Sequence, residues 1–125
     1  MMAGPDLVHN MIVEDVLDQI PRKQWARLQT QDVDIVDEAS EPVPDLVVLK
    51  RDATPEAGRL LPSELITLVV EVVSKTSVVR DYLVKRSIYA AGKVPAYLII
   101  DPIMEHCVLL TMPVGEGTQP TTRHR

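Results

Sequence analysis

The chain has 125 residues, of which 46% are hydrophobic and 25% charged, and this composition excludes a disordered protein and fits one domain with a real core. Phe is absent and aromatic residues make up only 3%, so Val, Leu and Ile must build that core. The net charge of −5 gives no overall attraction to nucleic acid, so any such binding must use a local patch.

The single cysteine, Cys107, excludes a disulfide framework or a cysteine-based zinc site within one chain, which fits a reducing cytoplasm. No apolar run approaches the ~20 residues that span a bilayer. The first ten residues lack the charged and apolar regions of a signal peptide. We therefore expect a soluble, cytoplasmic protein.

The first predicted element is an amphipathic helix over residues 6–20, where apolar side chains recur at spacings of three and four and Pro21 follows. Polar and apolar residues alternate over 25–36, which predicts a half-exposed strand or a hairpin arm. After an acidic loop, a short strand over 44–50 opens at Asp45. Residues 51–63 are rich in Pro, Gly and charge and predict a surface loop.

A buried strand is predicted over 65–73, followed by a helix from about Ser77 to Ala91 that ends at Gly92. Residues 94–101 and 106–112 predict two further strands that pair with each other. The domain is expected to span 1–112, and the tail 113–125 is expected to be disordered. This order predicts an α/β (α+β) fold with a mixed β-sheet of four to five strands flanked by helices.

Three charged residues stand where the pattern predicts apolar ones. Glu71 interrupts the run "LVVEVVS" (68–74), where an isolated buried carboxylate would be costly. Asp45 opens another buried strand. Lys85 lies on the predicted helix, and at ~100° per residue it falls within roughly 40° of an inward-facing stripe. That stripe contains Val78, Tyr82 and Tyr89.

Two carboxylates and a lysine directed at one region have two readings. Asp45 and Glu71 can hold a divalent cation such as Mg²⁺, with Lys85 orienting water or stabilising charge on a phosphate. Five basic residues against Asp81 give residues 75–93 a local excess of +4, which suits a polyanion. These are Lys75, Arg80, Lys85, Arg86 and Lys93. A structural ion pair between Glu71 and Lys85 explains the same residues, and the pattern alone slightly favours it.

Three segments together resemble the Uma-two family of restriction endonucleases, in the PD-(D/E)XK nuclease superfamily. They are "PD" (44–45), "LVVEVVS" (68–74) and "RDYLVKRSIYAAGKVPAYLIIDP" (80–102). The resemblance covers about residues 44–102, with weaker similarity from His9 onward, where the family often has a histidine early in its first helix. It implies a restriction-endonuclease-like core and an endonuclease that cleaves DNA with Mg²⁺ (or Mn²⁺).

By the same resemblance, Asp45 and Glu71 are the metal ligands and Lys85 completes the catalytic set. The usual superfamily lysine stands two residues after the glutamate, where this chain has Val73, and Lys85 matches the position used when the lysine comes from the next helix. Four other residues are candidates for supporting the site, although packing, capping or surface exposure explains them equally well. These are Ser74, Lys75, Tyr89 and Glu14.

The chain departs from the family pattern in two places. The family glycine before Val-Pro is replaced by Lys93, with Gly92 one place early. The family also begins with a hairpin of the kind "Y-E-L-V-D-G-E", which this sequence does not include. We expect either an N-terminally truncated copy with impaired activity or a start placed downstream of the true one. His9 is expected to pack or cap the first helix.

Three hypotheses remain open at this point. The first is a metal-dependent DNA endonuclease. The second is an inactive remnant that acts as a nucleic-acid-binding or interaction module. The third is a structural dimer that keeps Glu71 and Lys85 as an internal ion pair. A homodimer is also expected for an active enzyme, because nucleases that cut both strands often pair.

Overall fold

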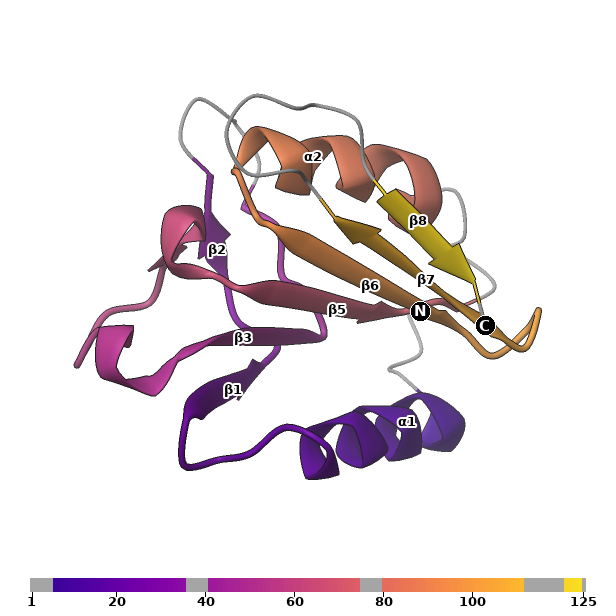
Figure 1. The fold of residues 1–125 in the computed structure, drawn as a ribbon, viewed down its shortest axis with the longest axis horizontal. Helices are drawn as coiled ribbons and strands as arrows, with labels where there is room; N and C mark the ends of the chain where they lie inside the picture. Colours follow the sequence, from indigo (N-terminus) through magenta and orange to yellow (C-terminus); the bar gives the residue numbers. More distant parts are fainter. Residues whose placement is uncertain (1–5, 36–40, 75–79, 112–120, 125) are drawn as a thin grey trace.

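A six-stranded sheet, with the strand order β1-β3-β5-β6-β7-β8, forms the centre of the molecule (Figure 1). The computed structural model describes residues 6–35, 41–74, 80–111 and 121–124. The strands are β1 (Trp25–Gln29), β3 (Leu46–Lys50), β5 (Leu68–Val72), β6 (Ala96–Asp101), β7 (His106–Thr111) and β8 (Thr121–His124). β5 and β6 run parallel and the other neighbouring pairs run antiparallel, so the sheet is mixed.

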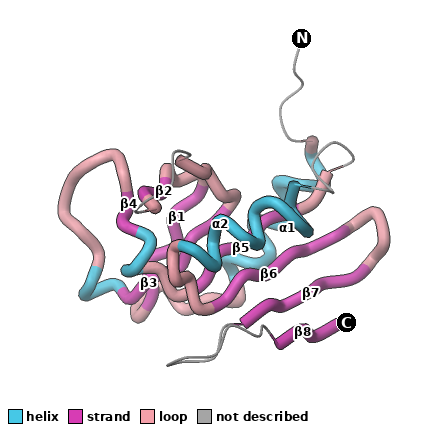
Figure 2. The backbone as a smooth tube through the Cα atoms, turned by 90° about the horizontal axis from the view of Figure 1, so that it is seen from above, coloured by secondary structure: helices cyan, strands magenta, loops and turns pink. Residues whose placement is uncertain are grey.

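Two helices cover opposite faces of this sheet, α1 (Leu7–Asp18) below and α2 (Lys85–Ala91) above in Figure 1. A π-helical turn, η3 (Arg80–Val84), leads directly into α2. Seen from above in Figure 2, α2 lies over β5 and β6, the parallel pair that it connects. No helix in the described ranges combines the length and the apolar character needed to cross a membrane.

Short elements fill the connections. β2 (Val33–Asp34) and β4 (Leu61–Pro62) form a separate two-stranded parallel sheet. Two 3₁₀ turns follow β3 and β4, namely η1 (Arg51–Ala53) and η2 (Ser63–Leu65). The loop predicted over 51–63 therefore contains a short strand, which packs with β2 against the larger core.

The core has two parts, one on each face of the sheet. The larger cluster lies under α2 and includes Tyr89 and Tyr97, whose ring centroids are 5.0 Å apart. The smaller cluster joins three strand residues to the end of α1 and the turn after it, namely Leu46, Val48 and Val70 with Val16, Leu17 and Ile20. Without Phe, β-branched and leucine side chains fill most of this space, as the composition predicts.

Both ends of α1 are fixed by side chains. Asp6 caps the start, since its carboxylate accepts a hydrogen bond of 2.9 Å from the backbone N–H of His9. At the other end Arg27 of β1 donates to the carbonyl of Leu17 at 2.8 Å, which places a cation at the negative end of the helix dipole. The contact with Arg27 ties the last turn of α1 to β1.

The predicted fold class is confirmed, with three corrections of detail. The sheet has six strands instead of four to five, because residues 121–124 of the tail predicted to be disordered form β8 and pair with β7. The alternating segment 25–36 is split into β1 and β2, since Thr30 adopts a φ of 53° between them. The helix predicted from Ser77 begins, within the described residues, as a π turn at Arg80.

Candidate active site

The pairing of β3 with β5 brings Asp45 and Glu71 together. Leu46 lies opposite Val70 in this antiparallel pair, so the preceding residue, Asp45, falls opposite Glu71. The backbone N–H of Asp45 donates to Glu71 Oε1 at 3.3 Å, and Asp45 Oδ2 accepts a bond of 2.7 Å from the N–H of Val72. Two carboxylates from neighbouring strands are thereby held side by side.

Glu71 is 2% exposed, and α2 supplies the groups that compensate its charge. Lys85 Nζ lies 2.8 Å from Glu71 Oε2, and the hydroxyl of Tyr89 donates to the same oxygen at 3.0 Å. Lys85 and Tyr89 are four residues apart, which places them on one face of the helix. The helical phase read from the sequence therefore predicted correctly that both side chains face the sheet.

His9, on the first turn of α1, contacts the other carboxylate. Its Nε2 lies 3.1 Å from Asp45 Oδ1, and the side chains of His9 and Asp45 are 16% and 24% exposed. The site therefore reaches solvent on the side of Asp45 while Glu71 stays enclosed. His9 was expected to pack or cap the helix, and the structure adds a contact to Asp45 that this expectation did not include. The early histidine of the family was the one signal in the sequence that could have pointed to it.

A second polar cluster fixes the turn that precedes Lys85. The Tyr82 hydroxyl donates to Asp101 Oδ2 at 2.9 Å and lies 3.0 Å from His106 Nε2. Asp101, 2% exposed, also accepts backbone N–H bonds of 3.0 Å from Ile103 and Met104 through Oδ1. Tyr82 shares the inward stripe with Lys85, so the helix segment is held on the sheet at both the Asp101 cluster and Glu71.

Of the three other predicted supporting residues, two are exposed and one lies outside the described residues. Ser74 is exposed, two residues past the end of β5. Glu14 is exposed on α1 and makes no hydrogen bond or ion pair to the site among the described residues. Lys75 lies outside the described residues, as does the side chain of Arg80 in the predicted basic patch.

The donor chemistry of Asp45 and Glu71 suits a hard cation. Mg²⁺ is usually held through one or two carboxylates, with waters completing its coordination. The described residues contain no group of three or more His, Cys, Asp or Glu side chains arranged to hold a metal. A site built here would therefore use the two carboxylates and leave several positions for water or substrate.

A protein-family model decides the family. The model named Uma2, described as "Putative restriction endonuclease", matches residues 1–124. The chain belongs to the Uma2 family. The match extends over almost the whole sequence, beyond the 44–102 region on which the resemblance depended, and confirms it.

The Uma2 chain is also similar to a solved structure, described as a "putative nuclease belonging to DUF820" from Anabaena variabilis ATCC 29413. The two share 18% sequence identity with a TM-score of 0.66, over 98% of this chain and 69% of the other. At this identity the likeness shows the fold alone. Among curated proteins, no match was found. The family is therefore the one described as restriction endonucleases and the fold is shared with the Anabaena protein, while the roles of Asp45, Glu71 and Lys85 stay predictions.

Proposed function

We propose that this Uma2 protein is a Mg²⁺-dependent endonuclease that hydrolyses phosphodiester bonds in DNA. The observation that carries the proposal is the position of Glu71, a buried carboxylate held between Asp45 on one strand and Lys85 on a helix. Membership of the family supports a nuclease. DNA as substrate and Mg²⁺ as cofactor are the parts that we add.

Asp45 and Glu71 would hold the metal ion, Mg²⁺ or Mn²⁺. When bound, such an ion supplies positive charge against the anionic phosphate and the oxygens that gain charge during hydrolysis. The two carboxylates carry two negative charges against the single positive charge of Lys85, so the local charge favours a cation. The partial exposure of Asp45 leaves a side from which the ion and the DNA can approach.

The other residues orient these groups. The N–H of Val72 and the His9 ring hold the two oxygens of Asp45 in one orientation. The hydroxyl of Tyr89 holds Glu71. Lys85 would place its ammonium beside the reacting phosphate, where it stabilises developing negative charge or orients the attacking water. Because these groups are fixed before substrate binds, little reorganisation is needed during reaction.

An inactive remnant that binds nucleic acid or another partner is the alternative. One observation favours it: all four oxygens of Asp45 and Glu71 already contact protein donors. A carboxylate pair so fully engaged can serve the fold alone. The two proposals differ in whether the site binds a metal and cuts DNA.

Nicking of supercoiled plasmid separates them. We expect wild-type protein to convert the plasmid to open-circular or linear DNA with Mg²⁺ and to leave it supercoiled with EDTA. Glu71→Gln should lower the rate by about 100-fold or more, the size of effect that follows loss of one preorganised charge-stabilising group. Glu64→Gln removes an exposed carboxylate in η2 and serves as the matched control, with an unchanged rate. No cleavage together with no Mg²⁺ binding in calorimetry would contradict the endonuclease and favour the remnant.

A further inference from the structure

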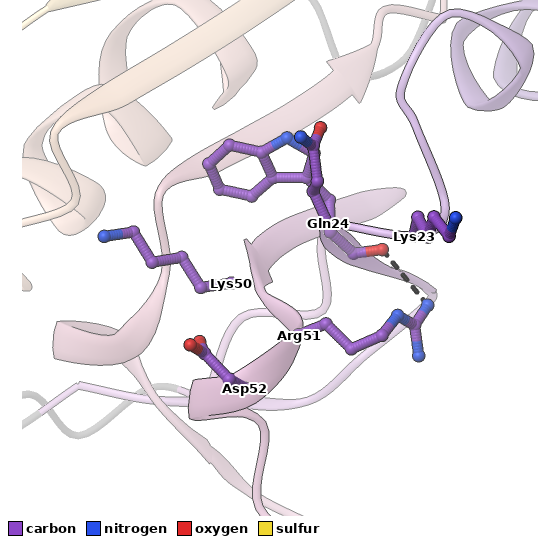
Figure 3. A pocket seen from close by; sticks show the side chains of 6 residues that line it. Lys23, Gln24, Lys50, Arg51 and Asp52 are labelled. Atoms are coloured by element: carbon purple, nitrogen blue, oxygen red, sulfur yellow. Dashed lines mark hydrogen bonds between the residues drawn. The ribbon is translucent and has the colours of Figure 1, made fainter.

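An open pocket of about 540 Å³ lies at the other end of β3 from Asp45 (Figure 3). Its walls come from the loop before β1, from the start of β1 and from the end of β3 with η1. The lining residues are Lys23, Gln24, Trp25, Lys50, Arg51 and Asp52. None of them belongs to the predicted catalytic set, and the volume is within the range of small-molecule sites, roughly 300–1,000 Å³.

The pocket concentrates positive charge in an acidic protein. Three lining residues, Lys23, Lys50 and Arg51, are cationic and one, Asp52, is anionic, a local excess of two against a net charge of −5 for the chain. Within the part of the chain that the structure describes, none of the three cations forms an ion pair. Their charge is therefore free to meet an anionic ligand.

Arg51 is positioned without being neutralised. Its guanidinium donates to the carbonyl of Arg22 at 2.7 Å and to the carbonyl of Trp25 at 3.1 Å. Carbonyl acceptors fix the side chain and leave its full positive charge. Trp25 is partly buried against the smaller core cluster, on the α1 side of the sheet, and adds an apolar wall to the pocket. A fixed guanidinium and two exposed ammonium groups beside an indole suit a ligand that carries phosphate next to an apolar group, as a nucleotide chain does.

We propose that this pocket binds the phosphate backbone of the DNA substrate at a distance from the bond that is cut. The proposal rests on the proposed function for the identity of the ligand. Asp45 stands just before β3 and Lys50 ends it, so the pocket lies ~17 Å from the site along the strand. At 3.4 Å per base pair this corresponds to about five base pairs of duplex. β1 is the last strand at this edge of the sheet, so none of the described strands pairs with the outer edge of β1, whose first residue, Trp25, lines the pocket.

The salt dependence of binding to a DNA duplex tests the proposal. Binding is measured in EDTA, which prevents metal-dependent cleavage, by fluorescence anisotropy across a range of salt concentrations. Each phosphate contact contributes roughly 0.9 to the slope of log affinity against log salt. We expect Lys23→Gln and Lys50→Gln each to lower the slope by about this amount and the double variant by roughly 1.8, with several-fold weaker binding. Both side chains are exposed, so the fold should be retained.

Two further variants sharpen the result. Arg59→Gln also removes one exposed positive charge, but hydrogen bonds to Asp32 and Glu41 raise the pKa of that guanidinium and compensate its charge. It should leave the slope unchanged. Asp52→Asn removes the one anion in the pocket and should tighten binding, an effect of opposite sign.

The outcomes distinguish this proposal from the proposed function. If the Lys23→Gln/Lys50→Gln variant has the salt-dependence slope and the affinity of the wild type, the proposal that the pocket binds DNA is overturned, even if Mg²⁺-dependent cleavage is found. Failure of the wild-type protein to bind duplex at low salt would overturn it as well. Weaker DNA binding by the pocket variants, with no cleavage by the wild-type protein, would support DNA binding by the pocket and would contradict the proposed endonuclease activity.

Discussion

At the scale of single residues, Glu71 is a buried carboxylate whose two oxygens both contact protein groups. A carboxylate that is 2% exposed requires compensation, and it receives the ammonium of Lys85 and the hydroxyl of Tyr89. Buried ion pairs are weak evidence for stability, because well-packed apolar residues often do as well in the same place. The ion pair therefore adds little stability that an apolar pair would lack, and the proposed metal site would give these charges a function.

Lys85→Met should show how far Glu71 depends on its partner. The substitution leaves a buried carboxylate uncompensated, so the free energy of unfolding should fall by about 3–5 kcal/mol. Urea denaturation measures this, with Arg86→Met as a neighbouring exposed control that should change by less than ~0.5 kcal/mol. The double variant Glu71→Leu/Lys85→Met should recover most of the loss. A double variant no more stable than Lys85→Met would show that the pair does not act as a unit.

We expect His9 to act as a positioning residue for Asp45. His9→Ala removes the contact to Asp45 Oδ1, and loss of one hydrogen bond to a charged group should slow cleavage roughly tenfold. His9→Gln keeps a side-chain donor and should restore part of the rate. Single-turnover plasmid cleavage at saturating Mg²⁺ is the measurement. Equal rates for wild type and His9→Ala would remove His9 from the site.

At the scale of elements, the segment 80–91 supplies the side chains that contact the buried carboxylates of the sheet. The π turn η3 and helix α2 present Tyr82, Lys85 and Tyr89 to the sheet, and each meets a carboxylate there. π-helical turns often occur at functional sites. The contact between Tyr82 and Asp101 ties the π turn to the end of β6, one turn before Lys85.

Tyr82→Phe tests this attachment. The change removes the hydroxyl and leaves Asp101 Oδ2 without this donor, so the free energy of unfolding should fall by about 1–3 kcal/mol. Thermal or urea unfolding gives the value, and Leu83→Ala, at an exposed neighbour, is the control. An unchanged stability in Tyr82→Phe would mean that water replaces the hydroxyl at no cost.

The end of α2 depends on a close approach that only glycine allows. A Cβ at Gly92 would lie 2.9 Å from Ser63 Oγ and 3.2 Å from Ile35 Cγ1, while the Ser63 hydroxyl donates to the Gly92 carbonyl. Gly92→Ala should therefore cost about 1–3 kcal/mol of unfolding free energy through overpacking. Lys93 adopts a φ of 62°, so Lys93→Gly should be neutral or stabilising by up to ~1 kcal/mol. Denaturation of both variants checks the contrast, and a Gly92→Ala protein as stable as wild type would refute it.

At the scale of the whole molecule, the sequence predicted what depends on periodicity and missed what depends on pairing. Helical phase placed Lys85 and Tyr89 on the sheet, and the apolar runs located β3, β5, β6 and β7. The contact between His9 and Asp45 joins residues 36 positions apart in sequence, and no local pattern encodes it. β8 was missed because "TTRH" is polar and pairs only with β7.

The pocket at Lys23 and Lys50 was missed for a related reason. Its cations come from two segments that only the pairing of β1 with β3 brings together. The predicted homodimer is a property of the assembled molecule and stays a prediction. It would produce linear plasmid without prior accumulation of open circles, because two sites cut both strands in one encounter.

The central claim, that Asp45 and Glu71 hold a metal ion with which Lys85 acts, is tested most directly by one measurement. This is the single-turnover rate of plasmid cleavage as a function of Mg²⁺ concentration, for wild type, Glu71→Gln and Lys85→Met. Lys85→Met should saturate at the same or lower Mg²⁺ concentration as wild type, because the competing ammonium is gone. Its maximal rate should be about 100-fold lower. Glu71→Gln should lower the maximal rate as well and should need a higher Mg²⁺ concentration to saturate, because one of the two proposed ligands is lost. Wild-type cleavage by Glu71→Gln would contradict the account.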